Sequence, residues 1–180
     1  MIKKADAVKK LDMINNSAAC PWDLVVLDED TGAALVISRE VIRMMPYDFP
    51  GGRPVTWSEC SCREWLNNDF FQSLPDQIRD LAIKSRVTTP DNCAIPGGQD
   101  TEDYVFLLSI DEYELLTDEM RPAVLNGIPC WWWLRSPGYA ATDVANVMPN
   151  GMLDGGLSGH GFYSHCDCGG IRPAMYLNLN

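Results

Sequence analysis

Trp-Trp-Trp-Leu-Arg-Ser-Pro-Gly at residues 131–138 and Gly-Ile-Arg-Pro-Ala-Met-Tyr-Leu at residues 170–177 are the two stretches that decide the fold. Each has the apolar content and the short length that suit a buried strand. We therefore expect the last strands of the chain at residues 130–134 and 171–177, with a long irregular connection between them. Burying one large apolar side chain contributes roughly 1.5–3 kcal/mol, so these strands should anchor the C-terminal end.

The tryptophan run and the two arginines are the expected structural anchors of these strands. Side chains alternate between the two faces of a strand, so Trp131 and Trp133 should share one face and Trp132 the other. We expect at least one of these tryptophans to lie in the core, and the other face could underlie a binding surface. Arg135 and Arg172 are expected to hold loop carbonyls or a carboxylate in bidentate fashion.

The segment between the strands has the composition of a binding surface. Residues 157–170 read Leu-Ser-Gly-His-Gly-Phe-Tyr-Ser-His-Cys-Asp-Cys-Gly-Gly. They show no hydrophobic period that would pack as a helix or a strand. Aromatic side chains supply rigid contact area and small polar ones supply adaptable hydrogen bonds, which is the mixture found on binding loops.

The same segment has an unusual coding property. Every residue type in 157–170 can be encoded by a codon that ends in C, a set that omits Met, Trp, Lys, Glu and Gln. The wider segment 137–170 also lacks Lys, Glu, Gln and Trp, although it contains Met148 and Met152. Diversification of AAC codons at their first two bases would give this bias. Glycine-rich loops often lack long charged side chains, and composition alone favours that simpler explanation.

Length, charge and composition limit the class of protein. A chain of 180 residues can bury the core of one domain. Its 6 Trp, 14 Gly and 12 Pro favour a loop-rich fold with short strands over a helical bundle. The formal net charge of −11 argues against nucleic acid and against an anionic membrane surface as partners. No run of 18 apolar residues is present, so we expect no membrane insertion.

The N-terminus and the cysteines leave the location of the protein open. Residues 1–10 carry the positive charges of a signal peptide without an apolar stretch after them. A cytoplasmic product, a phage-particle component and a surface protein that leaves by another route all stay open. Seven cysteines cannot all pair within one chain, and we interpret them mainly as reduced thiols. Cys60, Cys93 and Cys130 are the expected core residues among them.

Hydrophobic periodicity and turn residues predict an α+β order in one domain, residues 1–180. Residues 1–19 are expected to form a helical N-terminal extension. The predicted elements are a helix over 5–14, a hairpin of strands 22–27 and 33–38 around a turn at 28–32, a helical stretch after Ser58, a helix over 74–84, a buried strand over 104–109, a helix over 111–116, and short strand fragments at Asn146, Val147 and Leu153.

Several motifs, in this order and spacing, resemble an uncharacterised domain family that is common in gut bacteria and their phages. The resemblance covers roughly residues 20–180. The motifs are Thr56 with Trp57, residues 63–67 (Arg-Glu-Trp-Leu-Asn), Phe70 with Phe71, residues 105–109 (Val-Phe-Leu-Leu-Ser), residues 132–138 (Trp-Trp-Leu-Arg-Ser-Pro-Gly) and residues 170–174 (Gly-Ile-Arg-Pro-Ala).

This resemblance implies a C-type lectin-like fold of the formylglycine-generating-enzyme type, with two helices, short antiparallel strands and long loops. Many members of the family are variable proteins of diversity-generating retroelements, in which an error-prone copy of a template repeat replaces the 3′ end of the gene. The implied function is non-enzymatic binding of a protein or glycan ligand, without a cofactor or a metal, by a variable region at 131–180. A homo-oligomer is compatible with this function because several copies add avidity.

The resemblance implies that a variable region lies immediately before Gly170, which is where the coding bias is found. The bias is then the expected result of diversified AAC codons. Met148 and Met152 cannot be reached from AAC at the first two bases and are taken as fixed. The diversified positions are expected to be solvent-directed. They are Tyr139, Asp143, Asn146, Asp154, Ser158, His160, Phe162, Tyr163, Ser164, His165 and Asp167.

A metal site is the sharpest alternative chemistry. Cys60 and Cys62, like Cys166 and Cys168, form a Cys-x-Cys pair, and His160 and His165 lie near the second pair. Thiolate and imidazole suit zinc, but zinc sites mostly use Cys-x₂₋₄-Cys spacing. Residues i and i+2 of a strand point to opposite faces. A Cys166–Cys168 disulfide and chance cysteines in a diversified loop are at least as plausible as zinc.

Three further alternatives have weaker support. An oxidase similar to the formylglycine-generating enzymes would need a fixed pair of active-site cysteines with copper, whereas Cys166 and Cys168 lie in the apparently variable segment. Asn150 and Asp154 are only a partial match to the set of oxygen ligands that calcium-dependent sugar binding needs. A Ser-His-Asp triad lacks a nucleophile elbow. An invariant carbohydrate- or protein-binding module of the same fold is the main alternative to a diversified binder.

Overall fold

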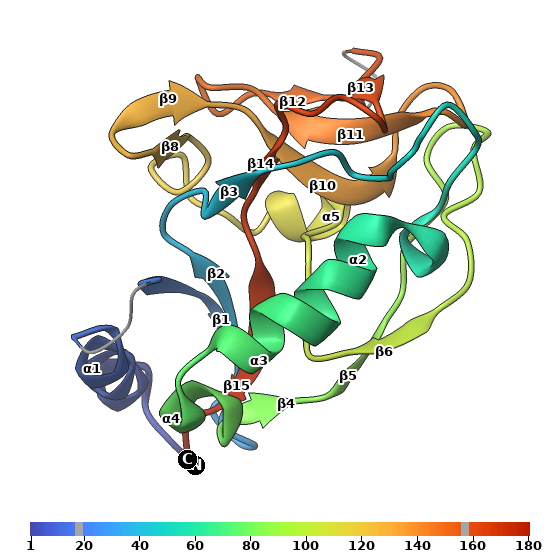
Figure 1. Ribbon diagram of the computed structural model, residues 1–180. Coiled ribbons are helices and arrows are strands. Elements are labelled where there is room, and N and C mark those ends of the chain that lie inside the picture. The colour runs from blue at the N-terminus through green and yellow to red at the C-terminus, as the bar shows by residue number, and fades with distance from the viewer. Residues whose placement is uncertain (17–19, 156–158) are drawn as a thin grey trace.

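The computed structural model describes residues 1–16, 20–155 and 159–180, and it has the α+β composition expected from the sequence (Figure 1). The elements are α1 (Lys4–Asn15), β1 (Trp22–Leu27), β2 (Ala33–Ser38), β3 (Arg43–Met44), the 3₁₀ turn η1 (Trp57–Glu59), α2 (Ser61–Trp65), the π-helical turn η2 (Leu66–Phe70), α3 (Phe71–Ser73), α4 (Asp76–Arg79), β4 (Ala82–Ile83), β5 (Ser85–Val87), β6 (Thr101–Asp103), β7 (Val105–Phe106), α5 (Ile110–Tyr113), β8 (Ala123–Leu125), β9 (Ile128–Cys130), β10 (Trp132–Pro137), β11 (Asp143–Val147), β12 (Leu153–Asp154), β13 (Phe162–Tyr163), β14 (Gly170–Ile171) and β15 (Ala174–Asn178). None of the helices in the described part of the chain combines the length and the apolar composition that a membrane-spanning helix needs.

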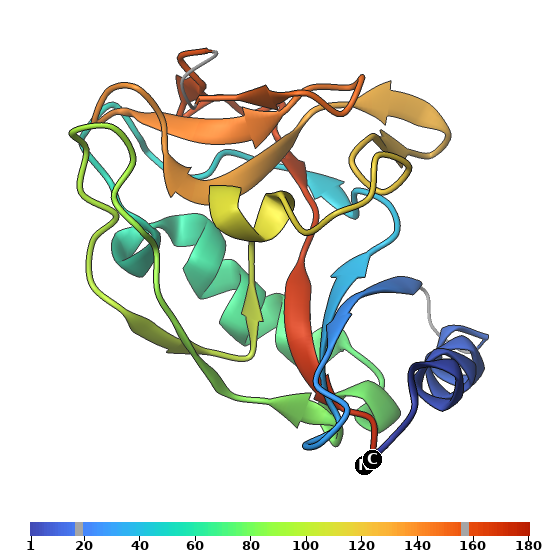
Figure 2. The same cartoon turned by 180° about the vertical axis from the view of Figure 1, so that it is seen from behind.

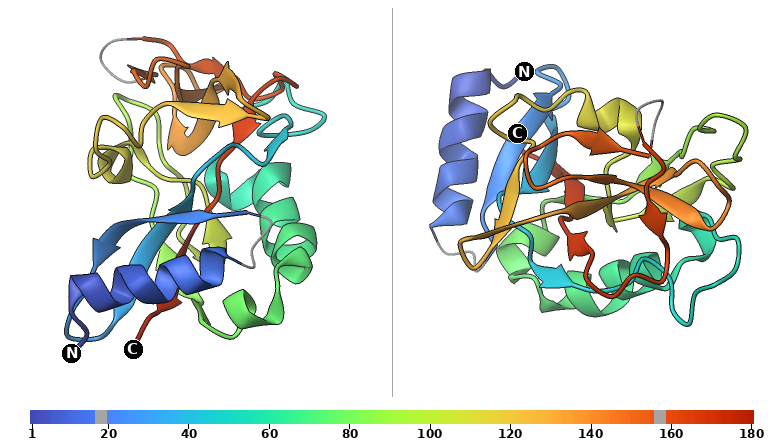
Figure 3. Two further views of the ribbon diagram at one scale, coloured as in Figure 1. Left: turned by 90° about the vertical axis from the view of Figure 1, so that its left-hand side faces the viewer. Right: turned by 90° about the horizontal axis from the view of Figure 1, so that it is seen from above.

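The first sheet joins the two ends of the chain. Its order is β1-β2-β15-β4, and β7 also pairs with β15. The predicted hairpin is confirmed as β1 and β2, and its turn is closed by hydrogen bonds from Thr31 to the Asp28 carboxylate and by Gly32 at a φ of +76°. A positive φ of this kind favours glycine. Because β15 pairs with β2, the two termini lie side by side at one end of the molecule, and α1 runs along β1 (Figures 1 and 3).

The second sheet is built mainly from strands between Trp132 and Ile171, with β3 at one edge. Its order is β12-β11-β10-β14-β3, with β13 also paired to β11. β10 is central, antiparallel to β11 and parallel to β14. This sheet lies at the end of the molecule away from both termini (Figure 1). The helical run formed by α2, η2 and α3 lies beside the sheets, and α5 lies next to β10 (Figure 2).

The tryptophan run alternates as expected from strand geometry. The rings of Trp131 and Trp133 meet edge to face with centroids 4.6 Å apart. The Trp132 ring lies on the other side, where the guanidinium of Arg172 is 5.1 Å from its centroid. Trp132 and Trp133 are fully buried and Trp131 is half-buried. These side chains connect the core to the loops above the second sheet.

Some sequence expectations are wrong, and each failure has a local cause. The predicted helix over 74–84 is replaced by α4 and β4, because residues 82 and 83 pair with β15 and leave only one helical turn. The helix predicted over 111–116 ends at Tyr113, although the capping box of Ser109 and Glu112 starts it firmly. Cys93, expected in the core, is exposed in a loop at a φ of +55°.

The expected strand over 104–109 is also shortened, because the carbonyls of its later residues accept hydrogen bonds from a buried arginine. Only Val105 and Phe106 pair as β7. The Arg135 guanidinium donates to the carbonyl of Leu107 at 2.7 Å and to that of Thr88 at 2.8 Å, and its backbone N–H donates to Leu108. Both carboxylate oxygens of Glu112 accept from the same guanidinium. Arg135 therefore joins β10 to β7, to α5 and to the loop after β5.

Arg172 has a similar role between the two sheets. It is buried, and it donates to the carbonyls of Ser38 at 2.8 Å, Arg39 at 3.3 Å and Met120. Burial lowers the pKa of this guanidinium to about 10. A buried charge is tolerated only when its hydrogen bonds are satisfied, so these carbonyls fix the connection between β14 and β15.

We predict that Arg135→Met lowers the free energy of unfolding by about 3–5 kcal/mol, because it leaves Glu112 and two carbonyls without their donor. Urea unfolding of the purified chain measures this change. Arg39→Met is the matched control, because the exposed Arg39–Asp23 ion pair should contribute less than about 1 kcal/mol. Equal losses in the two variants would contradict the anchoring role of Arg135.

Candidate functional site

The candidate site is the surface formed by β13 and the described residues around it, at the end of the molecule away from both termini (Figures 1 and 3). β13 pairs with β11, with Tyr163 opposite Asp143 and Phe162 opposite Val144. Residues opposite one another in a sheet share a face. Val144 is buried, so Phe162 points inward and Tyr163, which is 62% exposed, points outward. β13 therefore has one side that packs against the core and another that faces solvent.

Five of the predicted positions present exposed side chains, and we call these five residues the distal surface. The rings of Tyr139 and His160 meet edge to face at 5.1 Å, and those of Tyr163 and His165 stack at 5.7 Å. A hydrogen bond of 3.0 Å runs from the backbone N–H of Tyr139, between β10 and β11, to the carbonyl of His160, just before β13. The exposed residues of the distal surface are Tyr139, His160, Tyr163, His165 and Asp167.

The remaining predicted positions fall into three groups. Asp143, Asp154 and Phe162 are half-buried. Asn146 and Ser164 are fully buried, so the expectation that they face solvent is wrong. Ser158 lies outside the residues that the structure describes.

The burial of Asn146 and Ser164 follows from their backbone pairing. Asn146 lies in β11 with β10 on one side and β12 on the other, and its amide Nδ2 contacts the sulfur of Met148 at 3.6 Å. Ser164 donates its N–H to the carbonyl of Thr142 at 3.0 Å and accepts from the N–H of Asp48 at 2.9 Å. The Oδ1 of Asn146 and the Oγ of Ser164 have no hydrogen-bond partner within the described residues.

The distal surface rests on an aromatic platform. Phe162 lies against Trp131, with ring centroids 4.5 Å apart, and Trp131 lies against Trp133. The indole N–H of Trp133 donates to the carbonyl of Met45 at 3.1 Å, and the N–H of Met45 donates to Gly169 at 2.9 Å. A Cβ on Gly169 would lie 1.9 Å from the Trp133 Nε1, so only glycine allows this approach.

A neighbouring loop that sequence reasoning did not place at the site borders the distal surface. Phe49 is 74% exposed, and its N–H donates to the Ser61 hydroxyl at 2.9 Å. A Cβ on Gly51, at a φ of +74°, would lie 2.1 Å from the Cβ of His165, so this loop contacts the predicted segment directly. Its proline and glycine content is typical of a loop, but no local signal in the sequence indicates its neighbour.

A second missed contribution comes from the loop between β5 and β6. The Asn92 amide donates to the carbonyl of Pro137 at 2.7 Å and to that of Gly155 at 2.6 Å. One side chain thus holds the end of β10 beside the residue that follows β12. A surface groove of about 420 Å³ lies close by, beside the β11–β12 turn. It is lined by Met148, Pro149, Asn150, Met152, Leu153 and Asp154.

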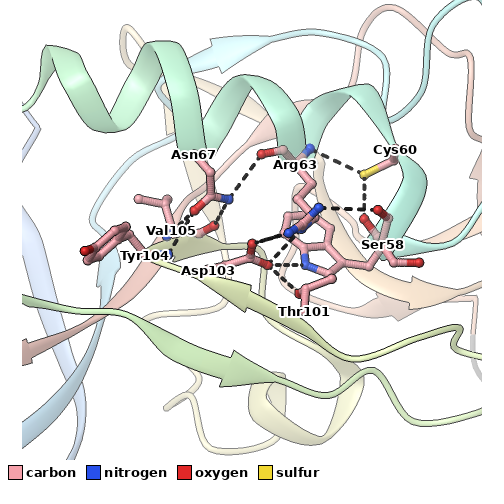
Figure 4. A network of polar contacts seen from close by, with 9 residues as sticks. Ser58, Cys60, Arg63, Asn67, Thr101, Asp103, Tyr104 and Val105 are labelled. Atoms are coloured by element: carbon pink, nitrogen blue, oxygen red, sulfur yellow. Dashed lines mark hydrogen bonds and ion pairs between the residues drawn. The ribbon is translucent and has the colours of Figure 1, made fainter.

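A polar network between α2 and β6 has a structural role (Figure 4). The buried Asp103 carboxylate accepts from the Arg63 guanidinium at 2.9 Å, from the Trp57 indole at 3.0 Å and from the Thr101 hydroxyl at 2.6 Å. The Asn67 amide bridges to the backbone of Val105 at 2.8 Å. These contacts occupy Asp103 fully and hold α2 and η2 against β6 and β7.

The cysteine and histidine groups that suggested a metal are spread over the molecule. Cys60 caps α2 and Cys62 lies in its first turn. Both are buried, and burial raises the pKa of Cys60 to about 12 and that of Cys62 well above its ordinary value. This environment favours the thiol over the thiolate that binds zinc. Cys166 and Cys168 lie far along the chain in the loop after β13, beside His165. Within residues 1–16, 20–155 and 159–180, no three metal-binding side chains gather at one point.

Comparison with known families supports a common origin for most of the chain. Residues 31–179 match a family described as a domain of unknown function, DUF6273, so the chain belongs to that family. No curated protein and no solved structure matches the chain.

We predict that Gly169→Ala lowers the free energy of unfolding by about 1–3 kcal/mol, because the new methyl group overlaps the Trp133 indole. Trp133→Phe removes the indole atoms that cause the overlap, at its own cost in packing. The double variant should therefore lose less than the sum of the two single losses, by at least about 0.5 kcal/mol. Thermal and urea unfolding of the three variants measure this coupling, and strictly additive losses would contradict the contact.

Proposed function

We propose that this member of the DUF6273 family is a non-enzymatic binding protein that presents the distal surface to a protein or cell-surface ligand. Its gene would be diversified by a retroelement, and its fold would be a branch of the C-type lectin fold. The observation that carries the proposal is the separation between exposed residues of one segment and the buried frame directly beneath them. Tyr139 and Tyr163 are 59% and 62% exposed, whereas Trp132, Trp133 and Val144 are almost fully buried.

The energetic consequence of this separation suits a surface that changes from copy to copy. Exposed substitutions usually change stability by less than about 0.5 kcal/mol, whereas removing a large core side chain costs about 3–5 kcal/mol. Variation on the distal surface would therefore leave folding intact. Tyrosine and histidine there offer flat contact area together with hydrogen-bonding groups, which is the chemistry of antibody-like binding surfaces.

The coding bias and the motif resemblance support the same proposal from independent directions. All five residues of the distal surface belong to types encoded by codons that end in C. The segment lies immediately before Gly-Ile-Arg-Pro-Ala at 170–174, where the resemblance places a variable region. The buried Asn146 and Ser164 are removed from the proposed set of diversified positions, since a large side chain at either would have to displace the core.

An invariant binding module is the second candidate, and the groove beside the β11–β12 turn favours it. Met148 and Met152 line that groove and cannot arise from AAC by changes at the first two bases. A ligand bound there would meet fixed side chains. Diversification of the distal surface requires a template copy and a reverse transcriptase gene, whereas an invariant module that binds at the groove requires neither. The genomic neighbourhood therefore distinguishes the two candidates.

DNA sequencing around the gene tests the proposal. We expect an imperfect copy of the region that encodes residues 131–174, together with a reverse transcriptase gene. Mismatches between the copies should fall at template adenines and at codons for the distal surface. If a complete genomic neighbourhood contains neither the copy nor the reverse transcriptase gene, diversification is excluded and the invariant module is favoured.

We predict that a library with codons ending in C at the five distal-surface positions yields mostly folded protein, with free energies of unfolding within about 0.5 kcal/mol per position of the parent. Soluble yield and thermal midpoints of randomly picked members measure this tolerance. The matched control library varies Trp132, Leu134, Val144, Val147 and Ile171, which are buried, and should yield mostly unfolded protein. Similar yields from the two libraries would contradict the division into surface and frame.

A further inference from the structure

Two cysteines of the loop after β13 lie with their sulfur atoms in contact. The Sγ atoms of Cys166 and Cys168 are 3.1 Å apart, at the distance of a thiol–thiol hydrogen bond. Cys168 is exposed and Cys166 is half-buried, so reagents in solution can reach the pair. The sulfurs need to approach by only about 1 Å to reach the disulfide bond length of about 2.05 Å.

Backbone hydrogen bonds fix the loop on both sides of this pair. Before it, Ser164 is held by Thr142 and by Asp48, with distances of 3.0 and 2.9 Å. After it, the carbonyl of Gly169 accepts from Met45 at 2.9 Å, against the tryptophan platform. Within the loop, the N–H of Cys166 donates to the carbonyl of Tyr163 at 2.9 Å. Reacting groups held in this way behave as if at high concentration, so the two sulfurs react with each other readily.

The other cysteines do not compete for a reagent in the same way. Cys60, Cys62 and Cys130 are buried, and burial raises the pKa of each thiol. Burial also raises the pKa of Cys20, to about 12. Thiolates are the attacking species in thiol–disulfide exchange, so these thiols react slowly at neutral pH. Cys93 is exposed, and its thiol donates to the Oδ1 of Asn92 at 3.7 Å, so it has a different partner from the loop pair.

We propose that Cys166 and Cys168 form a reversible redox site, at which a small-molecule disulfide such as oxidised glutathione converts the two thiols into one intramolecular disulfide. This inference does not depend on the proposed function, because it uses only the thiol pair and the fixed ends of its loop. The oxidant is the glutathione disulfide, and the reductant is the dithiol of the protein.

The reaction proceeds by two exchange steps. The Cys166 thiolate attacks one sulfur of glutathione disulfide, forms a mixed disulfide and releases one glutathione thiolate. Cys168 then loses its proton and attacks the Cys166 sulfur, which releases the second glutathione. The hydrogen bond with Cys166 is the main cause that raises the pKa of Cys168, so Cys168 keeps its proton longer and suits the second step. Two protein thiols are oxidised and one glutathione disulfide is reduced to two thiols.

Oxidation would act on the distal surface directly. Asp167 lies between the two cysteines and His165 precedes them, and both side chains are exposed. A disulfide closes a small ring around Asp167 and restricts the conformations of the loop. The position of two distal-surface residues therefore depends on the redox state of the protein.

The test uses the full chain, reduced and freed of reductant, and exposed to excess oxidised glutathione at neutral pH. We expect the wild-type chain to lose two titratable thiols at this loop and to keep no glutathione on Cys166 or Cys168. Digestion should give one peptide that contains both cysteines and lacks two hydrogen atoms. Cys168→Ser should keep about one glutathione per chain on Cys166, because the second step is removed. Cys166→Ser should likewise keep about one glutathione, on Cys168, because the partner thiol of the second step is missing. Cys93→Ser is the matched control, and its loop should behave as the wild-type loop does.

Three results would overturn the proposal. They are stable glutathione on the wild-type loop, a disulfide that joins Cys166 or Cys168 to another cysteine, and unreacted loop thiols under conditions in which Cys93 has acquired glutathione. Amide hydrogen exchange of the loop, compared between the reduced and oxidised chains, tests the conformational consequence. Slower exchange of residues 165–168 after oxidation is expected, and unchanged exchange would contradict the link to the distal surface.

Discussion

The buried guanidinium of Arg135 is the interaction on which the rest of the structure depends. A charge in the core is stable only if carbonyls and carboxylates surround it. Here they come from the loop after β5, the end of β7 and Glu112 in α5. Because Arg135 itself lies in β10, one side chain ties the central strand of the second sheet to segments that support the first. It also ends β7 early, since the carbonyls that would continue the strand accept from Arg135.

This frame decides which parts of the C-terminal region can vary. Trp131 and Trp133 form a platform that is held by Met45 from the N-terminal half, and Phe162 rests on it. Gly169 approaches the platform too closely for any side chain. The loops between these contacts carry exposed side chains with little packing of their own. Tolerance to substitution is therefore expected to be local, because backbone hydrogen bonds and a few buried rings determine it. It should be lost at the buried residues Asn146 and Ser164.

Local patterns predicted the parts of the fold that local physics determines. The hairpin of β1 and β2 followed from β-branched runs around Asp28, and the opposite faces of Trp132 and Trp133 followed from strand periodicity. The strand at 82–83 could not be predicted, because it exists only where β15 arrives from the far end of the chain. The same holds for Phe49 beside the distal surface and for the burial of Asn146. Each depends on contacts between separate segments of the chain, which composition and periodicity do not encode.

The thiol pair shows how a fixed frame can confer chemistry on the loop that is proposed to vary. Cysteine is among the residues that codons ending in C can encode, so both cysteines are compatible with diversified positions. Their reactivity, however, would come from the fixed contacts around them: Ser164 is held by two backbone bonds and Gly169 by Met45. These restraints hold the sulfurs of Cys166 and Cys168 3.1 Å apart. The proposed redox site can therefore exist in this copy of the protein without being a property of the family, and the proposed binding surface does not require it.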